Sequence, residues 1–179
     1  GFSVDTVELH SAYYITEPLF GVFEDRMTAR NKSENSIFPR FEAFSTNLEI
    51  PNFFENVDYM GGFSIIGQRF FASGKKDKKA HFKFWYDSLL VLDLKAERFV
   101  IKSDELLSNE SEVCFKLNRD SLYHMKSDIS YQPGERILRI DRPNKGMSMT
   151  PFVDSYHNLI LDIDRIRWNI SEPTFTLGG

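Results

Sequence analysis

Histidine and carboxylate side chains are the first candidates for chemistry in this chain of 179 residues. The four histidines are His10, His81, His124 and His157. No two of these histidines have the short i, i+4 spacing of a helical metal motif. Tyr123-His124 does return further along the chain as Tyr156-His157, which leaves a ligand role open. We favour the simpler interpretation, in which these histidines are polar side chains at turns or strand ends.

A second candidate is the carboxylate pair Asp162 and Asp164, within the alternating run of residues 159–168. On a regular strand these side chains share one face and lie about 7 Å apart. That separation could hold a cation or flank a glycosidic bond. The simpler alternative is a solvated strand face opposite Leu161 and Ile163, and we favour it.

Catalytic motifs do not emerge from the rest of the sequence. It has no nucleophile elbow, phosphate loop, HExxH or EF-hand spacing, and Gly61-Gly62 lacks the companion glycine of a dinucleotide loop. The single cysteine, Cys114, excludes a disulfide within the chain and a cysteine-based zinc cage. We therefore predict a protein that is not an enzyme, with no catalytic, cofactor or metal residues, and leave its binding residues unassigned.

Charge gives a weaker indication of partners. The formal net charge is −4, which does not favour nucleic acid. The one basic cluster, residues 74–79, could meet a phosphate or an anionic lipid head group. A lysine-rich hairpin tip that discourages aggregation is the commoner use of such a cluster. No apolar run approaches the roughly 18 residues of a membrane span.

The elements that would position these side chains are strands. Aromatic content is high at 15%, which supplies apolar area for a core and argues against disorder. Runs with alternating or β-branched apolar residues span 4–9, 12–15, 19–23, 41–45, 48–50, 63–66, 82–86, 115–117, 137–142, 159–168 and 173–177. Turn chemistry separates them at 31–35, 52–56, 74–79, 108–111, 133–134 and 144–146. Residues 87–107 are the best helix candidate, but Phe99-Val100-Ile101 favours strand there.

An imperfect internal repeat accompanies the strands. Phe82-Lys83-Phe84, followed by Asp87-Ser88, returns as Phe115-Lys116-Leu117, followed at the same interval by Asp120-Ser121. A weaker third copy ends at Asp154-Ser155, after a nearly equal interval. A period of about 20–50 residues indicates stacked units that share one core, with the Asp-Ser pairs at equivalent corners. It predicts that Phe82 and Phe115 enter the same core, as do Phe84 and Leu117.

The short, regular spacing leaves no room for helical crossovers between parallel strands. We therefore predict an all-β fold of stacked short strands, a β-solenoid or an open β-roll, with a β-sandwich as the alternative. Residues 1–179 are expected to form a single all-β domain. Strand-like sequence lies close to both ends of the chain. We therefore expect the chain to be a fragment of a longer repeat protein, with terminal strands that pair with another molecule or with missing sequence.

The pattern of residues 82–88, 99–106 and 113–123 resembles the short-strand repeats of the organic-solvent-tolerance and lipopolysaccharide-transport family. It is also similar to long uncharacterised bacterial envelope proteins that carry such repeats. The likeness covers about residues 57–170 and includes no diagnostic motif. In that family an open β-roll shelters acyl chains along an apolar channel.

This resemblance implies an extracytoplasmic location, in the periplasm or cell envelope. Because no catalytic grouping emerges from the sequence, we expect a non-enzymatic structural or binding module, with a lipid or glycan carrier as the alternative. The expected partner is a protein or envelope component bound by strand pairing, with lipid or glycan as a further ligand, no nucleic acid and no membrane span in this chain.

Overall fold

A computed structural model describes residues 1–11, 15–26, 36–74, 78–117, 120–143, 150–155 and 157–178. The fold is all-β, and the described residues contain no helix, so the predicted fold class is confirmed. The strands are β1 (Phe2–Ser11), β2 (Ile15–Asp25), β3 (Arg40–Ala43), β4 (Leu48–Phe54), β5 (Val57–Ile66), β6 (Arg69–Ser73), β7 (Ala80–Tyr86), β8 (Leu89–Ala96), β9 (Arg98–Ile101), β10 (Leu106–Leu117), β11 (Asp120–Gln132), β12 (Ile137–Asp141), β13 (Phe152–Asp154), β14 (Leu159–Leu161), β15 (Arg165–Asn169) and β16 (Phe175–Gly178). Residues 87–107, the best helix candidate, lie in β8, β9 and β10 and in the connections of these strands.

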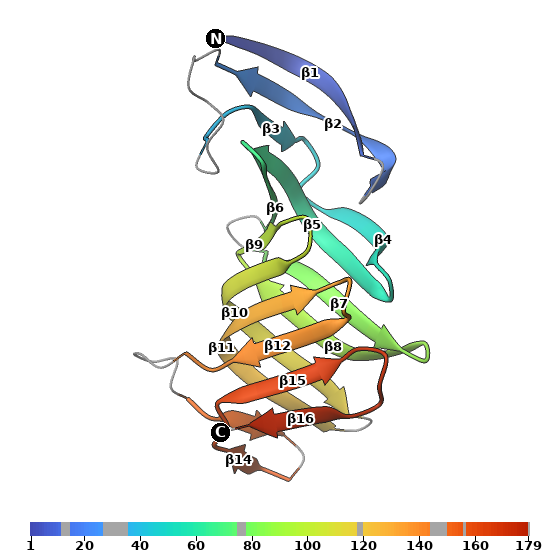
Figure 1. The fold of residues 1–179 in the computed structure, drawn as a ribbon, viewed down its shortest axis with the longest axis vertical. Helices are drawn as coiled ribbons and strands as arrows, with labels where there is room; N and C mark the ends of the chain where they lie inside the picture. Colours follow the sequence, from blue (N-terminus) through green and yellow to red (C-terminus); the bar gives the residue numbers. More distant parts are fainter. Residues whose placement is uncertain are drawn as a thin grey trace.

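All sixteen strands belong to one antiparallel sheet. Its main path runs β1-β2-β3-β5-β6-β9-β10-β11-β12-β15-β16, from the top to the bottom of Figure 1. Three of the long strands, β5, β10 and β11, change partners along their length, so β4, β7, β8, β13 and β14 attach as branches. This branching gives the sheet its width in the middle of the molecule.

The change of partners on β5 falls at Gly61-Gly62. Residues before this pair bond to β7, and residues after it bond to β6. Gly61 has a φ of 155°, and a Cβ there would meet the Tyr59 side chain, whose hydroxyl donates to the Gly62 carbonyl. The prediction that a strand starts after the glycines is therefore wrong, because β5 runs through them from Val57.

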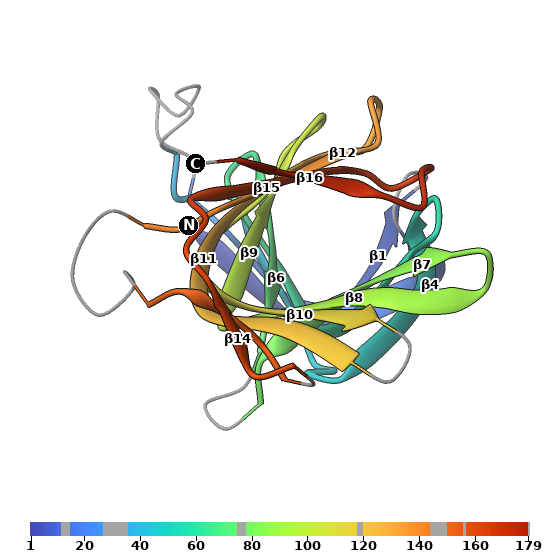
Figure 2. The ribbon, with the colours of Figure 1, turned by 90° about the horizontal axis from the view of Figure 1, so that it is seen from below.

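Seen along its long axis, the sheet curls so that β15 and β16 lie across from β8 and β10 (Figure 2). We call residues 48–178 of this sheet the roll. Aromatic rings pack across it: Trp168 contacts Phe84 at 6.3 Å and Phe115 at 6.1 Å between ring centroids. Tyr131 contacts Phe84 at 5.1 Å. Side chains therefore fill the interior of the roll, and opposite strands bury each other's apolar faces.

Alternation explains which residues face inward. On β7, Phe82 and Phe84 are fully buried, while Lys83 between them and Trp85 after them are more exposed. Phe82 and Phe115 lie in the same buried cluster, which confirms that part of the repeat prediction. The side chain of Leu117 lies outside the described part, so the pairing of Phe84 with Leu117 stays a prediction.

The spatial equivalence of β7 and β10 differs slightly from the sequence repeat. Both strands flank β8, where Leu92 lies between Phe84 and Phe115. Phe115 is therefore equivalent in space to Phe84, whereas the sequence repeat aligns it with Phe82. Because neighbouring inward-facing residues on a strand are two positions apart, either alignment places the same side chains in the core.

The Asp-Ser pairs do not occupy equivalent corners, contrary to prediction. Asp87 and Ser88, both with positive φ, form the two-residue turn between β7 and β8. Asp120 and Ser121 instead begin β11, where Asp120 pairs with Leu117 of β10. The Asp-Ser pair therefore forms a turn in the first copy and begins a strand in the second.

Several predicted boundaries are wrong because bulges absorb turn residues. Residues 108–111 lie inside β10, where two register shifts and the positive φ of Glu110 mark a bulge. Pro51 also lies inside a strand, at a register shift in β4 where the ladder is already interrupted. Pro18 lies at a register shift inside β2, which agrees with the expectation that the runs on its two sides form either separate strands or one broken strand. The predicted turns at 31–35 and 144–146 and residues 12–14 fall outside the described residues.

The two outer strands of the path, β1 and β16, each pair along one edge only in the described structure. Within the described residues, β1 pairs only with β2, and β16 pairs only with β15.

The predicted run at 159–168 divides into β14 and β15, with its change of phase at Arg165, where β15 begins. An ion pair between Arg136 and Glu55 links the β11–β12 turn to the β4–β5 turn.

Candidate functional site: a cationic groove on the outer face

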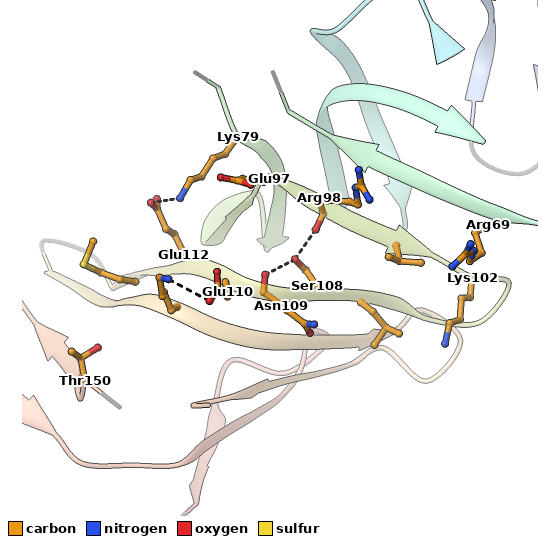
Figure 3. A pocket seen from close by; sticks show the side chains of 14 residues that line it. Arg69, Lys79, Glu97, Arg98, Lys102, Ser108, Asn109, Glu110, Glu112 and Thr150 are labelled. Carbon is orange, nitrogen blue, oxygen red and sulfur yellow. Dashed lines mark hydrogen bonds and ion pairs between the residues drawn. The ribbon is translucent and has the colours of Figure 1, made fainter. Parts of the chain in front are cut away.

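A groove of about 1130 Å³ crosses the outer face of the sheet over β6, β9, β10 and β11. Its floor is apolar, made by Val100 and Leu107 on adjoining positions of β9 and β10, with Met125 on β11. The charged side chains around this floor are shown in Figure 3. The groove therefore combines an apolar base with ionic walls, the general composition of ligand sites.

Two neighbouring irregularities shape this part of the sheet. The register between β10 and β11 shifts between Ser108 and Ser111, and again between Ser111 and Val113. Glu110, in the first shift, has a φ of 54° and forms an ion pair with Lys126 across the strands at 3.3 Å. Bulges bend strands and re-aim side chains, and here they lie within the groove wall.

The groove differs from the whole chain in the sign of its charge. Its basic residues are Arg69, Lys79, Arg98, Lys102 and Lys126, and its acidic residues are Glu97, Glu110 and Glu112. Five basic residues thus face three acidic ones, while the chain has 22 basic and 26 acidic residues. A locally positive surface on an acidic protein favours an anionic ligand.

The positive charge is concentrated at one end. Arg98 and Arg69 both lie over the ring of Phe71, at 5.3 and 5.7 Å from its centroid. This contact covers Phe71, which is buried although it lies on the outer face. The Nε of Arg69 is buried and has no hydrogen-bond acceptor among the described residues, so this guanidinium retains unused donor capacity.

The opposite end is balanced by ion pairs. Lys79 bonds to Glu112 at 2.7 Å, and Lys126 pairs with Glu110. Lys79 is the last residue of the predicted basic cluster, so that cluster borders the groove. Its residues 75–77 lie outside the described part of the chain. Lys102 also pairs with Glu105, at 3.8 Å, so the basic groove residues without an ion pair among the described residues are Arg69 and Arg98.

The four histidines are not brought together. His10 pairs with Glu8 at 3.2 Å on β1, and His81 pairs with Asp93 at 3.1 Å between β7 and β8. His157 follows β13, where it approaches Asp154 and Asp120. His124 lies inside β11 rather than at a strand end, which corrects the prediction for that residue.

His124 is a buried structural residue. Its Nε2 is 2.8 Å from the Thr150 carbonyl, and its Nδ1 is 2.7 Å from the Ser127 hydroxyl. Since a carbonyl only accepts, Nε2 carries the proton and Nδ1 accepts from Ser127. Burial lowers the pKa of His124, and the positive charge of Arg142 adds to this effect. Ser127 is also buried, so this Ser–His pair has no access to a substrate.

Asp162 and Asp164 do not lie on a strand, because β14 ends at Leu161 and β15 begins at Arg165. The guanidinium of Arg142 bonds to both carboxylates at 2.6 Å, which raises the pKa of Arg142. Both carboxylates are exposed, in agreement with the solvated alternative. Their shared cation is therefore an arginine of this chain.

Apart from Lys79 in the basic cluster, the groove residues were not singled out from the sequence. Arg69 and Arg98 lie in different strands, and only the pairing of β6 with β9 places them over one ring. A weak signal was present, since each arginine precedes an aromatic residue in the order Arg-Phe. That dipeptide is common enough in strands that it identifies no site by itself.

Comparisons with known proteins returned no matching family model, no matching curated protein and no matching solved structure. Within the described residues, no helix is long and apolar enough to cross a membrane. The functional argument therefore rests on the geometry and charge of the groove.

Proposed function

We propose that this chain is a non-enzymatic binding module that holds an acidic segment of a partner protein in the outer groove. As the family resemblance implies, it belongs to an extracytoplasmic protein. The observation that carries the proposal is the excess of basic over acidic residues around an apolar floor, in a chain whose overall charge is negative.

The arginine end supplies the anionic contact. Guanidinium groups bind carboxylates through paired N–H donors, and Arg69 and Arg98 bring two such groups to this end of the groove. The stacking of Arg69 and Arg98 on Phe71 restricts both side chains before a ligand arrives. Such restriction reduces the entropy lost on binding.

The floor supplies the apolar contact. Met125 is 60% exposed, and Val100 and Leu107 adjoin across β9 and β10. A peptide with acidic and apolar side chains would cover these residues while its carboxylates meet the arginine end. Methionine suits a surface that adapts to different apolar partners.

Lipid or glycan carriage is the alternative, and the interior of the roll gives it less support. The aromatic side chains that suggested an apolar channel pack against each other across the roll, for example Phe115 on Phe175 at 4.8 Å. A carrier role would therefore have to use the outer groove, whose anionic ligand would then be a lipid head group.

The test is fluorescence anisotropy with a labelled peptide that alternates Glu with Leu. We expect saturable binding that weakens with added salt, and Arg98→Gln should weaken it about tenfold because a charged hydrogen bond is lost. Arg139→Gln is the matched control, since Arg139 is an exposed arginine on the outer face of β12, outside the groove.

A peptide with Lys in place of Glu should not bind. Equal loss of binding in both arginine variants would show a general charge effect and overturn the proposal. Binding to phosphatidylglycerol vesicles but not to the peptide would overturn it in favour of the lipid alternative.

A further inference from the structure

Two copies of the Asp-Ser repeat meet in space near the start of β11. Leu122 pairs with Asp154, and the Ser155 amide donates to the Ser121 carbonyl at 3.0 Å. The hydroxyls of Ser121 and Ser155 are 2.9 Å apart. This pairing brings Asp120 and Asp154 beside His157, and ligand atoms of the three side chains lie within 4.8 Å of one another.

Each carboxylate is oriented through one oxygen and presents the other to the imidazole. Oδ1 of Asp120 accepts from the Ser121 amide at 2.6 Å and the Ser155 hydroxyl at 3.2 Å. Oδ1 of Asp154 accepts from the His157 amide at 3.0 Å. The two Oδ2 atoms lie 3.6 Å (Asp120) and 3.3 Å (Asp154) from Nδ1 of His157.

The Asp154 contact is a long hydrogen bond, and the Asp120 contact is longer still. A charge-assisted N–H···O bond has its atoms about 2.7–2.9 Å apart, and the one proton on Nδ1 cannot point at two oxygens. For an ion about 2.1 Å from each ligand atom, tetrahedral geometry places the ligands about 3.4 Å apart. The observed separations of 3.3 and 3.6 Å lie on either side of that value.

We propose that Asp120, Asp154 and His157 form a binding site for a divalent transition-metal ion, of which zinc is the representative. The ion takes the place of the Nδ1 proton of His157. One nitrogen and two carboxylate oxygens make a ligand set that zinc accepts, whereas calcium requires six to eight oxygens. The Ser121 amide and the Ser155 hydroxyl act as outer partners that hold the Asp120 carboxylate in position, and the His157 amide does the same for Asp154.

This site departs from the sequence-based expectation of no metal residues, and it shares no residue with the groove. His157 is 61% exposed, so an ion reaches it from solvent, while Asp120 and Asp154 are 14% and 17% exposed. A metal here would tie β13 and the residues after it to the start of β11.

Isothermal titration of the full chain with Zn²⁺ tests the proposal. We expect one saturable site, weakened about tenfold or more by His157→Gln or Asp154→Asn, because each removes a ligand atom. Asp154→Asn keeps the oxygen that accepts from the His157 amide, and His157 is exposed, so both variants should keep the wild-type circular dichroism spectrum.

The matched control is His81→Gln. His81 also faces a carboxylate, Asp93, but it has no second carboxylate ligand in the described structure and should leave zinc binding unchanged. In nuclear magnetic resonance spectra, Zn²⁺ should shift the ring signals of His157 and not those of His81. No saturable binding, or equal weakening by His81→Gln and His157→Gln, would show that the cluster is only an ion pair.

Discussion

The β1–β2 hairpin and the roll are built from similar alternating sequence, but their apolar side chains have different fates. Phe2 and Phe20 of the hairpin are 51% and 53% exposed, whereas Phe82 and Phe115 of the roll are fully buried. In the roll, strands on the far side cover the inner face, as the contact of Phe115 with Trp168 shows. Alternation provides an apolar face, but only a second layer buries it.

The comparison also separates two kinds of edge. At the bottom of Figure 1, β16 ends a region whose inner face is packed, and Phe175 on this strand contacts Phe115. At the top, β1 is a long edge strand with mostly exposed side chains. Long exposed edges are templates for pairing with another chain.

The largest expected effect is on the core of the roll. Phe115→Ala should lower the free energy of unfolding by about 3–5 kcal/mol, because a fully buried ring leaves a cavity. Phe20→Ala in the hairpin should change it by less than about 0.5 kcal/mol, since that ring is half exposed. Urea denaturation measures both, and similar losses would remove the distinction between the two regions.

The next effect concerns association through the exposed edge. We expect light scattering to show an apparent mass that rises with concentration, because β1 has one unpaired edge in the described structure. Val4→Lys should reduce this association by placing a charge on the apolar side of β1, where Val4 is 41% exposed.

Thr176→Lys makes the same change in charge on the other edge strand, β16, and should reduce association less. If the wild-type chain stays monomeric at all concentrations, the prediction of strand pairing is wrong. If only Thr176→Lys acts, the edge that associates is β16.

The smallest expected effect is a pH dependence of the roll. The folded pKa of His124 lies below its ordinary value of about 6.5, so the unfolded chain binds a proton more readily than the folded chain. The stability from the neutral imidazole is complete above about pH 6.5 and is lost as pH falls toward the lowered folded value.

Urea midpoints at about pH 7.5 and pH 5.5 measure this dependence. His124→Gln should make it shallower, because glutamine keeps an amide donor and an acceptor but does not titrate. His10→Gln is the comparison variant, because His10 lies on β1 in the hairpin, outside the roll. A wild-type slope retained in His124→Gln would assign the pH dependence to other groups.

The sequence by itself determined the fold class and the inward face of the core strands. Period-two alternation on β7 and β10 places Phe82, Phe84 and Phe115 on one side, whichever alignment relates the copies. The sequence could not determine where the strands begin and end, because β10 passes through residues 108–111 as a bulge and β5 passes through Gly61-Gly62. Local turn chemistry cannot distinguish a turn from a bulge inside a long strand, since neighbouring strands decide which forms.

Only the tertiary structure decided the sites. The Asp-Ser repeat was visible in the sequence, but the pairing of β11 with β13 placed Asp154 and His157 beside Asp120. The pairing of β6 with β9 likewise placed Arg69 and Arg98 over Phe71. Residues far apart in the sequence become neighbours through sheet register, which depends on interactions along the whole sheet and is not encoded in either segment alone.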